Sequence, residues 1–325
     1  MNILVTGGAG YIGSATAEAL IKAGHSITVY DSLITGHHLA VPEGAKFIEA
    51  DLSDSHALVE VLTNEKLDAI MHFAALIEAG ESMKDPGRFY HNNLTNSLTL
   101  METAVRAGVK RFVLSSTAAV YQSSEEPLTE ESPLGPTNVY GHTKLMVEQA
   151  LDWYRPIYGL HFAALRYFNA CGALPGRGEA HRPESHLIPL VLRVPLGQRD
   201  AAAIYGTDYP PSDGTCIRDY IHIADLVSAH LLALDGLKER DRLIYNLGSG
   251  NGYSVREVIE TARQVTGHLI PAKELPRRPG DSAKLVASSE KIRRELSWKP
   301  EHDNLHDMIA SAWDWHKSHP KGYEK

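Results

Sequence analysis

The sequence predicts an α/β protein in which a doubly wound parallel sheet is covered by helices on both faces and is followed by a smaller, irregular C-terminal domain. Three observations lead to this fold class. Apolar, β-branched runs alternate with helical patterns, a glycine-rich turn joins the first run to the first helix, and the regular pattern stops near Asn169. Such alternation is typical of a parallel sheet whose ligands bind beyond the carboxyl ends of the strands. We expect domains at residues 1–169 and 170–325, and segments near 200–235 could return to the first domain.

Strands and helices can be placed from these patterns along the whole chain. In the first domain we expect a strand before the glycine turn and further strands at 26–31, 45–51, 67–74, 110–116 and 160–167, with helices near 11–23, 54–63, 86–107 and 138–157. Beyond Asn169, glycines and prolines interrupt the periodicity. Short strands are expected there at 202–205 and 243–247, with helices near 222–235, 254–266 and 303–317.

The glycine turn has the spacing of a dinucleotide-binding site. Gly7, Gly10 and Gly13 have no Cβ atoms, so the backbone can turn sharply and approach a pyrophosphate at the N-terminus of the following helix. The next strand ends in Asp31, whose carboxylate suits the two ribose hydroxyls of NAD and repels a 2′-phosphate. The combination predicts a Rossmann-type domain with bound NAD.

Composition excludes several classes of function. The chain of 325 residues has a net charge of −8 and no basic block, so we expect no nucleic-acid partner. It contains no apolar run of about 18 residues, so we expect no membrane span. The glycine motif near the N-terminus leaves no room for a signal peptide, and Cys171 and Cys216 are too few for a disulfide framework. We therefore expect a cytoplasmic protein.

Three side chains predict acid–base chemistry. Tyr140 and Lys144 are four residues apart, so on a helix they share one face. A tyrosine has a pKa of about 10, but an adjacent ammonium and a positively charged nicotinamide favour its phenolate. The pair could therefore accept a proton near neutral pH. Thr117, after the fifth strand, could bond the same substrate oxygen; alternatively, its hydroxyl only caps its own turn.

Together these motifs resemble the extended short-chain dehydrogenases/reductases, and within them the UDP-glucose 4-epimerase family, from residue 3 to about 298. The matching stretches are Gly7-Gly-Ala-Gly-Tyr-Ile-Gly13, Asp51-Leu52, His72-Phe-Ala-Ala75, Gly80-Glu-Ser82, Asn92-Asn93, Ser115-Ser-Thr117, Tyr140-x-x-x-Lys144, Arg166-Tyr-Phe-Asn169, Gly214-Thr-Cys-Ile-Arg-Asp-Tyr-Ile-His222 and Arg277-Arg-Pro-Gly-Asp281. The last two stretches point to a nucleotide-sugar substrate.

The resemblance implies a site and a reaction. The implied activity interconverts UDP-glucose and UDP-galactose through transient oxidation at C4 with tightly bound NAD, in a homodimer built from the helices near 86–107 and 138–157. The implied catalytic residues are Tyr140, Lys144 and Thr117. The implied cofactor-binding residues are Gly7, Gly10, Tyr11, Ile12, Gly13, Asp31, Asp51, Leu52, Phe73, Ala74, Ala75, Asn92, Ser115, Tyr140, Lys144 and Tyr167, with Asn93 near the nicotinamide and the sugar. The implied substrate-binding residues are Thr117, Asn169, Leu187, Tyr205, Arg218, Arg278, Asp281 and Leu285.

Related activities leave alternatives open. Dehydratases and a decarboxylase of the same scaffold place acids after the strand-five hydroxyl, where this chain has Ala118 and Ala119. UDP-glucuronate and UDP-N-acetylhexosamine epimerases remain alternatives, because Leu285 is neither bulky nor very small. An NAD-binding regulator without catalysis is a third alternative, although both Tyr140 and Lys144 are present. The chain also departs from the family at Ile77, where lysine is frequent, and at Ala170, where proline is usual.

The seventeen histidines raise the question of a metal site. His37 and His38 are adjacent and face apart, and no H-E-x-x-H motif or Cys/His cluster occurs. We therefore expect no metal.

Overall fold

The computed structural model describes residues 1–210, 213–278 and 281–324, which form two compact units. The first unit contains residues 1–120, 134–166 and 227–245, and the second contains 121–133, 167–226 and the chain from 246 onward. The chain thus returns to the first unit twice, at 134–166 and at 227–245. Pro279 and Gly280 of the Arg277–Asp281 motif lie outside the described residues.

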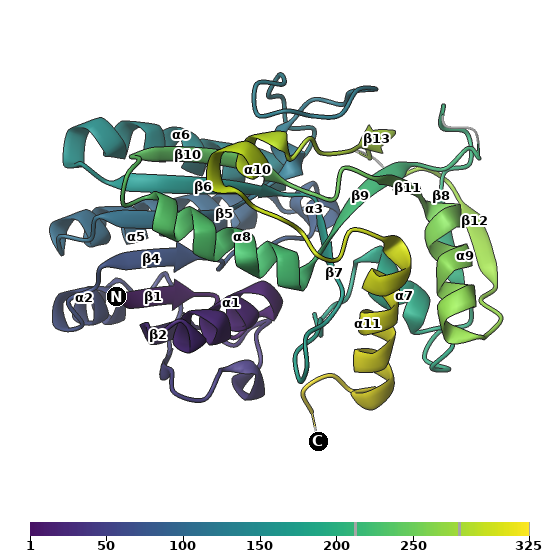
Figure 1. Cartoon of the computed structure of the whole chain (residues 1–325), viewed down its shortest axis with the longest axis horizontal. Helices are drawn as coiled ribbons and strands as arrows, with labels where there is room; N and C mark the ends of the chain where they lie inside the picture. The colour runs from purple at the N-terminus through teal and green to yellow at the C-terminus, as the bar shows by residue number, and fades with distance from the viewer. Residues whose placement is uncertain (211–212, 279–280, 325) are drawn as a thin grey trace. The chain divides into compact units, whose positions relative to one another are not determined.

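The first unit is built on a seven-stranded sheet with helices on both faces, which confirms the predicted fold class (Figure 1). Its order is β10-β6-β5-β4-β1-β2-β3, so β1 lies inside the sheet. Strands β2 and β3 follow on one side of β1, and β4, β5 and β6 follow on the other, so the order of strands reverses between β1 and β4. β3, β2, β1, β4 and β5 pair in parallel. The strands are β1 (Asn2–Thr6), β2 (Ser26–Asp31), β3 (Lys46–Glu49), β4 (Ala69–His72), β5 (Arg111–Thr117), β6 (His161–Tyr167) and β10 (Arg242–Leu247).

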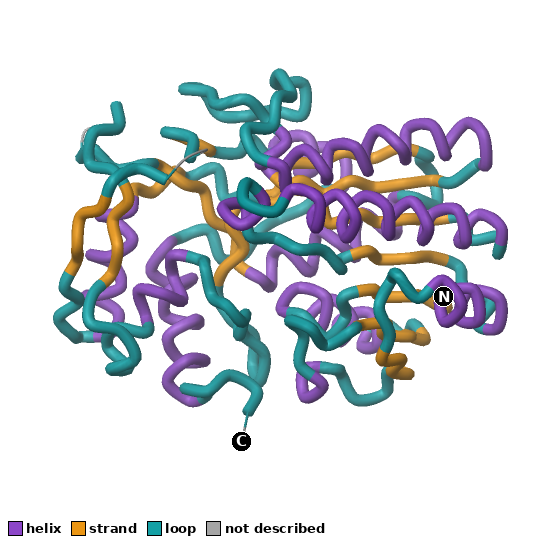
Figure 2. The backbone as a smooth tube through the Cα atoms, turned by 180° about the vertical axis from the view of Figure 1, so that it is seen from behind, coloured by secondary structure: helices purple, strands orange, loops and turns teal. Residues whose placement is uncertain are grey.

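Two layers of helices bury the faces of this sheet. α2 (Ser55–Asn64), α5 (Asn96–Arg106) and α6 (Val139–Tyr158) form one apolar core with the strands. The view from behind in Figure 2 shows long helices on that face, whereas α1 (Tyr11–Lys22) and α8 (Ile223–Gly236) lie on the opposite one (Figure 1). The expected helix at 86–107 is divided into α4 (Pro86–Phe89), a π-helical segment (Tyr90–Thr95) and α5.

Local signals fix the ends of α6, which carries the predicted catalytic pair. Asn138 caps its start by accepting a hydrogen bond of 2.8 Å from the backbone N–H of Gly141. Gly159 ends it in the left-handed conformation, with φ of 67°. Two short elements that come before α6 in the chain are α3 (Ala79–Ser82) and a 3₁₀ turn (Ala118–Val120).

The second unit has small sheets and a separate core. β9 (Ile217–His222) pairs with β7 (Asn169–Cys171), β11 (Gly252–Ser254) and β13 (Lys284–Leu285), and β8 (Ala202–Tyr205) pairs with β12 (Ala272–Leu275). α7 (Leu187–Leu192), α9 (Val255–Thr266) and α11 (Leu305–Ser318) supply most of its apolar core, and α10 spans Glu290–Leu296. Among the described residues, no helix is both long and apolar enough to cross a membrane.

Candidate active site

The glycine turn closes tightly against the neighbouring strand end. Gly7 has φ of +72°, and a Cβ on it would lie 2.5 Å from the backbone nitrogen of Ala74. A Cβ on Gly13 would lie 2.2 Å from the carbonyl oxygen of Gly7. Gly10, which precedes α1, has no side chain to cap the helix, so the first turn of α1 presents backbone N–H groups. With Tyr11, Ile12 and Gly13 in that turn, the arrangement suits a pyrophosphate.

Asp31 ends β2 beside this turn. Its carboxylate accepts hydrogen bonds of 2.9 Å from the backbone N–H groups of Ala9 and Leu33. Burial raises the pKa of Asp31, and these two hydrogen bonds oppose that shift. A Cβ on Gly36 would lie 2.8 Å from the carboxylate, so glycine there leaves room next to it. Each carboxylate oxygen retains acceptor capacity for a pair of hydroxyl groups.

The other predicted cofactor residues of this unit follow neighbouring strands of the same sheet. Asp51 and Leu52 come just after β3; the carboxylate of Asp51 accepts from Ser53, and Leu52 is buried in the core. Phe73, Ala74 and Ala75 come directly after β4, and the N–H groups of the first two donate to the carbonyl of Thr6. The structure therefore brings these residues to the carboxyl edge of the sheet, as parallel strands require.

Two asparagines occupy the π-helical segment. The side-chain amide of Asn93 donates to the carbonyl of Leu76 and accepts from the N–H of the same residue, at 2.9 and 2.8 Å. It also donates to the hydroxyl of Thr143, and Asn92 donates to it. Asn93 is buried and fixes the loop after β4 against α6. Its observed contacts give Asn93 a structural role.

Tyr140 and Thr117 meet at the start of α6. The hydroxyl of Thr117 lies close enough to the phenol of Tyr140 to lower its pKa. The hydroxyl of Thr117 accepts from the N–H of Ala119 at 3.1 Å, so it caps its own turn, as the alternative predicted. A Cβ on Gly141 would lie 2.3 Å from the carbonyl oxygen of Ala119, so α6 approaches this turn only because residue 141 is glycine.

Lys144 lies one turn along α6 from Tyr140 and is buried. Its ammonium donates a 2.8 Å hydrogen bond to the carbonyl of Ser115 at the end of β5. Burial lowers the pKa of Lys144 to about 8, although the carboxylate of Glu148 raises it. Lys144 thus joins the helix that carries Tyr140 to the end of β5.

Burial opposes the expected acidification of the phenol by the neighbouring ammonium. Burial raises the pKa of Tyr140 to about 12, the hydrogen bond from Thr117 lowers it, and the carboxylate of Glu78 raises it. Desolvation dominates because the phenolate would lose contact with water. Glu78 follows Ile77, one of the family departures, and sequence reasoning gave it no role. Its spacing from Tyr140 along the chain offered no signal.

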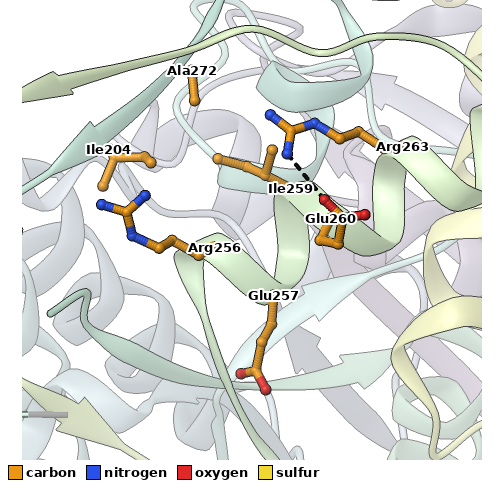
Figure 3. A pocket seen from close by; sticks show the side chains of 7 residues that line it. All are labelled: Ile204, Arg256, Glu257, Ile259, Glu260, Arg263 and Ala272. Carbon is orange, nitrogen blue, oxygen red and sulfur yellow. Dashed lines mark hydrogen bonds and ion pairs between the residues drawn. The ribbon is translucent and has the colours of Figure 1, made fainter. Parts of the chain in front are cut away.

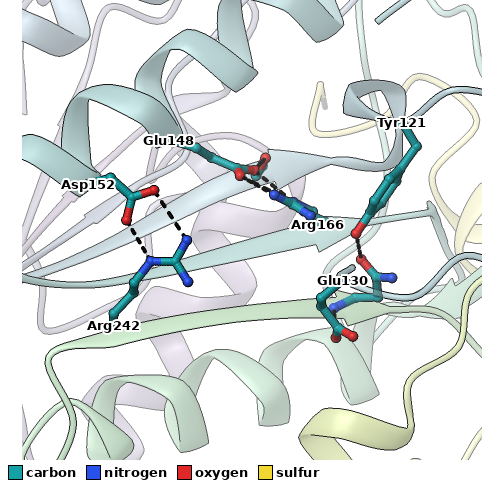
Figure 4. Close-up of polar contacts among 8 residues, drawn as sticks. Tyr121, Glu130, Glu148, Asp152, Arg166 and Arg242 are labelled. Atoms are coloured by element: carbon teal, nitrogen blue, oxygen red, sulfur yellow. Dashed lines mark hydrogen bonds and ion pairs between the residues drawn. The ribbon is translucent and has the colours of Figure 1, made fainter. Parts of the chain in front are cut away.

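A buried ion pair continues the row of polar side chains on α6. Glu148 accepts from Nη2 of Arg166 at 2.6 Å and from its Nε at 3.1 and 3.2 Å, and Ser116 also donates to it. Each side chain of the pair is only 3% exposed. One turn further, Asp152 pairs with Arg242 near the surface (Figure 4). Glu148 follows Lys144 by one turn on α6, so the buried pair ties this part of the helix to β6, which carries Arg166.

In the second unit, five predicted substrate residues form one cluster. Asp281 lies between two arginines, at 3.7 Å from Nη2 of Arg218 and 3.0 Å from Nε of Arg278. The guanidinium of Arg278 stacks over the ring of Tyr205 at 4.7 Å. Leu285 on β13 is in register with Arg218 on β9. Two guanidinium groups with an aromatic ring beside them suit a nucleoside diphosphate.

The remaining predicted residues of this unit lie on other elements. The amide of Asn169, on β7, donates to the carbonyl of Asp219 at 2.8 Å, next to Arg218 in the chain. Leu187 begins α7 and packs against the core of the unit. Tyr167 is buried at the end of β6.

Asp219 anchors this region, and the sequence pattern assigned it no role of its own. It is fully buried, and its oxygens accept from Ser249, Gly250 and Ala287 at 2.7 to 3.0 Å. Burial raises its pKa to about 6, while these donors oppose the shift. Because Arg218 precedes it on β9, the position of Asp219 fixes the strand that carries that arginine.

Two further features of the second unit contain no predicted site residue. A shallow pocket is lined by residues from α9, β8 and β12, including the ion-paired Arg263 and Glu260 (Figure 3). Separately, Glu179, His181, Glu184 and His186 bring one potential ligand atom each to within 4.8 Å of one another. The sequence spacing E-x-H-x-x-E-x-H was the signal for this group, and sequence reasoning did not consider it.

Comparison with known proteins settles the family. The profile of the NAD dependent epimerase/dehydratase family matches residues 3–248. The chain belongs to this family. The resemblance stated from the motifs is thereby confirmed, and the shared part of the family includes the glycine turn, the Tyr140–Lys144 pair and Arg218.

Members of the NAD dependent epimerase/dehydratase family match the chain over its full length. The UDP-glucose 4-epimerase of Halalkalibacterium halodurans is 50% identical over 327 residues, covering 99% of this chain and 98% of that protein. The UDP-glucose 4-epimerase of Lacticaseibacillus casei is 47% identical, covering 99% of each chain. The crystal structure of a UDP-glucose 4-epimerase at 49% identity has a TM-score of 0.96 and full coverage of both chains. That of Bifidobacterium longum, solved with NAD⁺ and UDP, has 36% identity, a TM-score of 0.95, and 99% and 100% coverage.

Proposed function

We propose that this chain interconverts UDP-glucose and UDP-galactose by transient oxidation at C4 with tightly bound NAD. The observation that carries the proposal is the placement of Tyr140 beside the hydroxyl of Thr117, with Lys144 one turn away on the same helix. The full-length similarity to UDP-glucose 4-epimerases supports the substrate.

The glycine turn fits the proposed cofactor, because added Cβ atoms at Gly7 and Gly13 would clash with backbone atoms. The residues that would hold NAD are the cofactor-binding residues given above, with Asp31 on the ribose hydroxyls. When bound, NAD supplies reversible oxidation of the sugar at C4.

The chain's own residues would move one proton. The oxygen of Tyr140 accepts the proton of the sugar 4-hydroxyl, and Thr117 orients that hydroxyl by a hydrogen bond. Lys144, held by the carbonyl of Ser115, stabilises the phenolate through its positive charge. Tyr140 returns the proton after the 4-keto sugar has turned its other face. Because burial opposes the phenolate, the ammonium and the positive charge of the oxidised cofactor must both contribute.

The turning of the sugar requires strong anchoring elsewhere in the substrate. Arg218, Arg278 and Asn169 would bind the diphosphate, and Tyr205 with Leu187 would frame the uracil. Small side chains such as Ala74, Ala75 and Ala118 would leave the hexose few directional contacts. The absence of a carboxylate in the side chains at 118 and 119 supports epimerisation over elimination of water.

The test is incubation of the purified chain with UDP-galactose and no added cofactor. UDP-glucose formation supports the proposal. Loss of water or carbon dioxide would indicate a dehydratase or a decarboxylase, and an unchanged substrate, with and without added NAD, would indicate a binding protein. Each of these other outcomes would overturn it.

The preference at the sugar 2-position needs a separate experiment. Leu285 is of intermediate size and is paired in register with Arg218. We propose the plain hexoses as substrates, and a panel that adds UDP-N-acetylhexosamines and UDP-glucuronate compares kcat/KM directly. A higher value for either of the latter would reassign the substrate.

We also propose a cytoplasmic homodimer that associates through α6 and the helices near 86–107. α6 buries one face against the sheet, yet Trp153, Ile157 and Tyr158 on it are 69%, 63% and 53% exposed. An apolar patch on a regular helix is typical of a protein interface. Light scattering should give twice the chain mass, and Trp153→Glu should shift the protein to the monomer.

The two free cysteines suit a reducing compartment.

A further inference from the structure

Glu179, His181, Glu184 and His186 form an unassigned cluster of metal-ligating side chains in the second unit, which we name the EHEH cluster. The four come from one short loop that leads into α7. Their potential ligand atoms, one from each side chain, all lie within 4.8 Å of one another. None of them belongs to the predicted catalytic, cofactor or substrate sets.

Both imidazoles turn their Nδ1 atoms toward the same carboxylate oxygen. Oε1 of Glu179 lies 3.1 Å from Nδ1 of His181 and 2.8 Å from Nδ1 of His186. The Nδ1 of His186 is also 2.8 Å from Oε1 of Glu184. One imidazole nitrogen carries at most one proton, so it cannot donate fully to both carboxylates.

The carboxylates of the cluster are removed from water. The side chain of Glu179 is 6% exposed and that of Glu184 is 1% exposed, whereas those of His181 and His186 are 20% and 36% exposed. Two buried carboxylates that converge on one point require compensating positive charge. A divalent cation at that point would supply it and would leave both histidines neutral.

The distances suit a first-row transition metal ion. In a tetrahedral zinc site, with bonds of about 2.0–2.2 Å, ligand atoms lie about 3.3 Å apart. The observed 2.8 and 3.1 Å contacts therefore need to open by only a few tenths of an ångström, and the remaining separations, all within 4.8 Å, need to close. Two imidazoles with two carboxylates favour zinc over magnesium or calcium, which prefer oxygen ligands alone.

We propose that the EHEH cluster binds one zinc ion as a structural site. Four protein ligands fill a tetrahedral shell, so no position remains for substrate. The loop is already supported: Nε1 of Trp315 donates to the carbonyl of Glu179, and Gly178 packs beneath the Trp315 ring. His186 directly precedes Leu187, so the ion would fix the start of α7.

The first test is the metal content of the full-length chain purified without a polyhistidine tag. After chelator-free gel filtration, mass spectrometry should find about one zinc ion per chain. Glu184→Gln and His186→Gln should each weaken zinc binding by at least about tenfold, because each removes a ligand. The matched control is the double variant His37→Gln with His38→Gln, which should keep its zinc. Zinc absent from the wild type, or unchanged in both ligand variants, overturns the proposal.

The second test does not depend on the folding of any variant. Chelator-treated wild-type chain should gain about 5 °C in Tm when zinc chloride is added in large excess over its Kd, and an equal concentration of magnesium chloride should give no gain. Anomalous scattering at the zinc edge should place the ion between the four side chains. No gain with zinc, or a peak elsewhere, overturns the proposal. Neither readout uses epimerase activity, so failure of the proposed reaction would leave this test intact.

Discussion

The candidate residues of the two units are held in place by different means. In the first unit, Tyr140 and Lys144 are fixed by burial, by a hydroxyl and by a backbone carbonyl. In the second unit, Arg278 is paired with Asp281 and its side chain is 53% exposed, whereas Arg218 lies 3.7 Å from Asp281 and also donates to the carbonyl of Ile217 at 2.9 Å. Groups proposed to transfer a proton are thus positioned by the fold, whereas both groups proposed to bind an anion lie beside one carboxylate of opposite charge.

This difference determines which contacts must rearrange when a ligand binds. A diphosphate that reaches the arginines competes with Asp281 for their N–H groups. No such exchange is needed at Lys144, because its partner is a carbonyl group of β5. We therefore expect substitutions in the first unit to reduce turnover or stability, and substitutions in the second to reduce affinity.

The largest effect should come from Tyr140→Phe. Removing the phenol oxygen removes the proposed proton acceptor, so kcat should fall by about 1,000-fold or more, while NAD stays bound. The conversion of UDP-galactose to UDP-glucose measures the loss, and absorbance of the denatured supernatant measures the cofactor. Tyr154→Phe, on the same helix, is the control and should retain activity. Turnover near the wild-type level in Tyr140→Phe would exclude this residue from the mechanism.

Next in size is the effect of Glu148→Gln on stability. The substitution leaves the buried charge of Arg166 without its partner, so the free energy of unfolding should fall by about 3 kcal/mol. Asp152→Asn is the matched control, because its pair with Arg242 has side chains 39% and 42% exposed and should contribute less than about 1 kcal/mol. Urea unfolding of both variants gives the comparison, and equal losses would contradict the distinction between buried and exposed pairs.

In the second unit, Arg218→Met should act on affinity. Loss of a charge-assisted contact to the diphosphate should raise KM for UDP-galactose by about 10- to 100-fold and change kcat much less. Steady-state kinetics separates the two parameters. Arg256→Met, in the same unit but paired with Glu274 at the surface, serves as the control. A fall in kcat with an unchanged KM would place Arg218 outside the binding of substrate.

The smallest effect, over the range from pH 7 to pH 5.5, concerns buried histidines, one in each unit. Burial lowers the pKa of His72 to about 3 and that of His222 to about 4, with Lys144 and His302 adding to the respective shifts. Unfolding restores pKa values near 6.5, so the unfolded chain binds more protons below that pH. The contribution of these two histidines to the free energy of unfolding is therefore fully present above about pH 6.5. It is lost as the pH falls toward 3–4, by about 1.4 kcal/mol per pH unit for each group.

Urea unfolding at pH 7 and at pH 5.5 tests this dependence. His72→Gln should reduce the slope of stability against pH by one histidine's share, and His306→Gln, at an exposed position, serves as the control. An unchanged slope in His72→Gln would mean that His72 does not contribute to acid unfolding.

Much of the first unit could be predicted because its signals are local. The helix expected at 11–23 is α1 (Tyr11–Lys22), and the strand expected at 160–167 is β6 (His161–Tyr167). β9 was missed because Arg218 and the buried Asp219 interrupt its apolar pattern. The place of β10 at the edge of the large sheet was also missed, since pairing between distant segments leaves no local periodicity.

The site shows the same limit. Helical spacing predicted the Tyr140–Lys144 pair, and a motif pointed to Arg218. Desolvation of the phenol and the charge of Glu78 could not be predicted, because both depend on the folded environment. The convergence of the EHEH cluster likewise required the loop conformation.

Gly141 has a consequence for how the proposed proton acceptor is aligned. Because the backbone of α6 rests directly against the carbonyl of Ala119, no flexible side chain lies between the helix and the turn that follows Thr117. Alanine at position 141 would wedge the two apart and carry the phenol away from its hydroxyl neighbour. The alignment of the Tyr140 phenol with the Thr117 hydroxyl is therefore set by contact between main-chain atoms, which the thermal motion of side chains disturbs little.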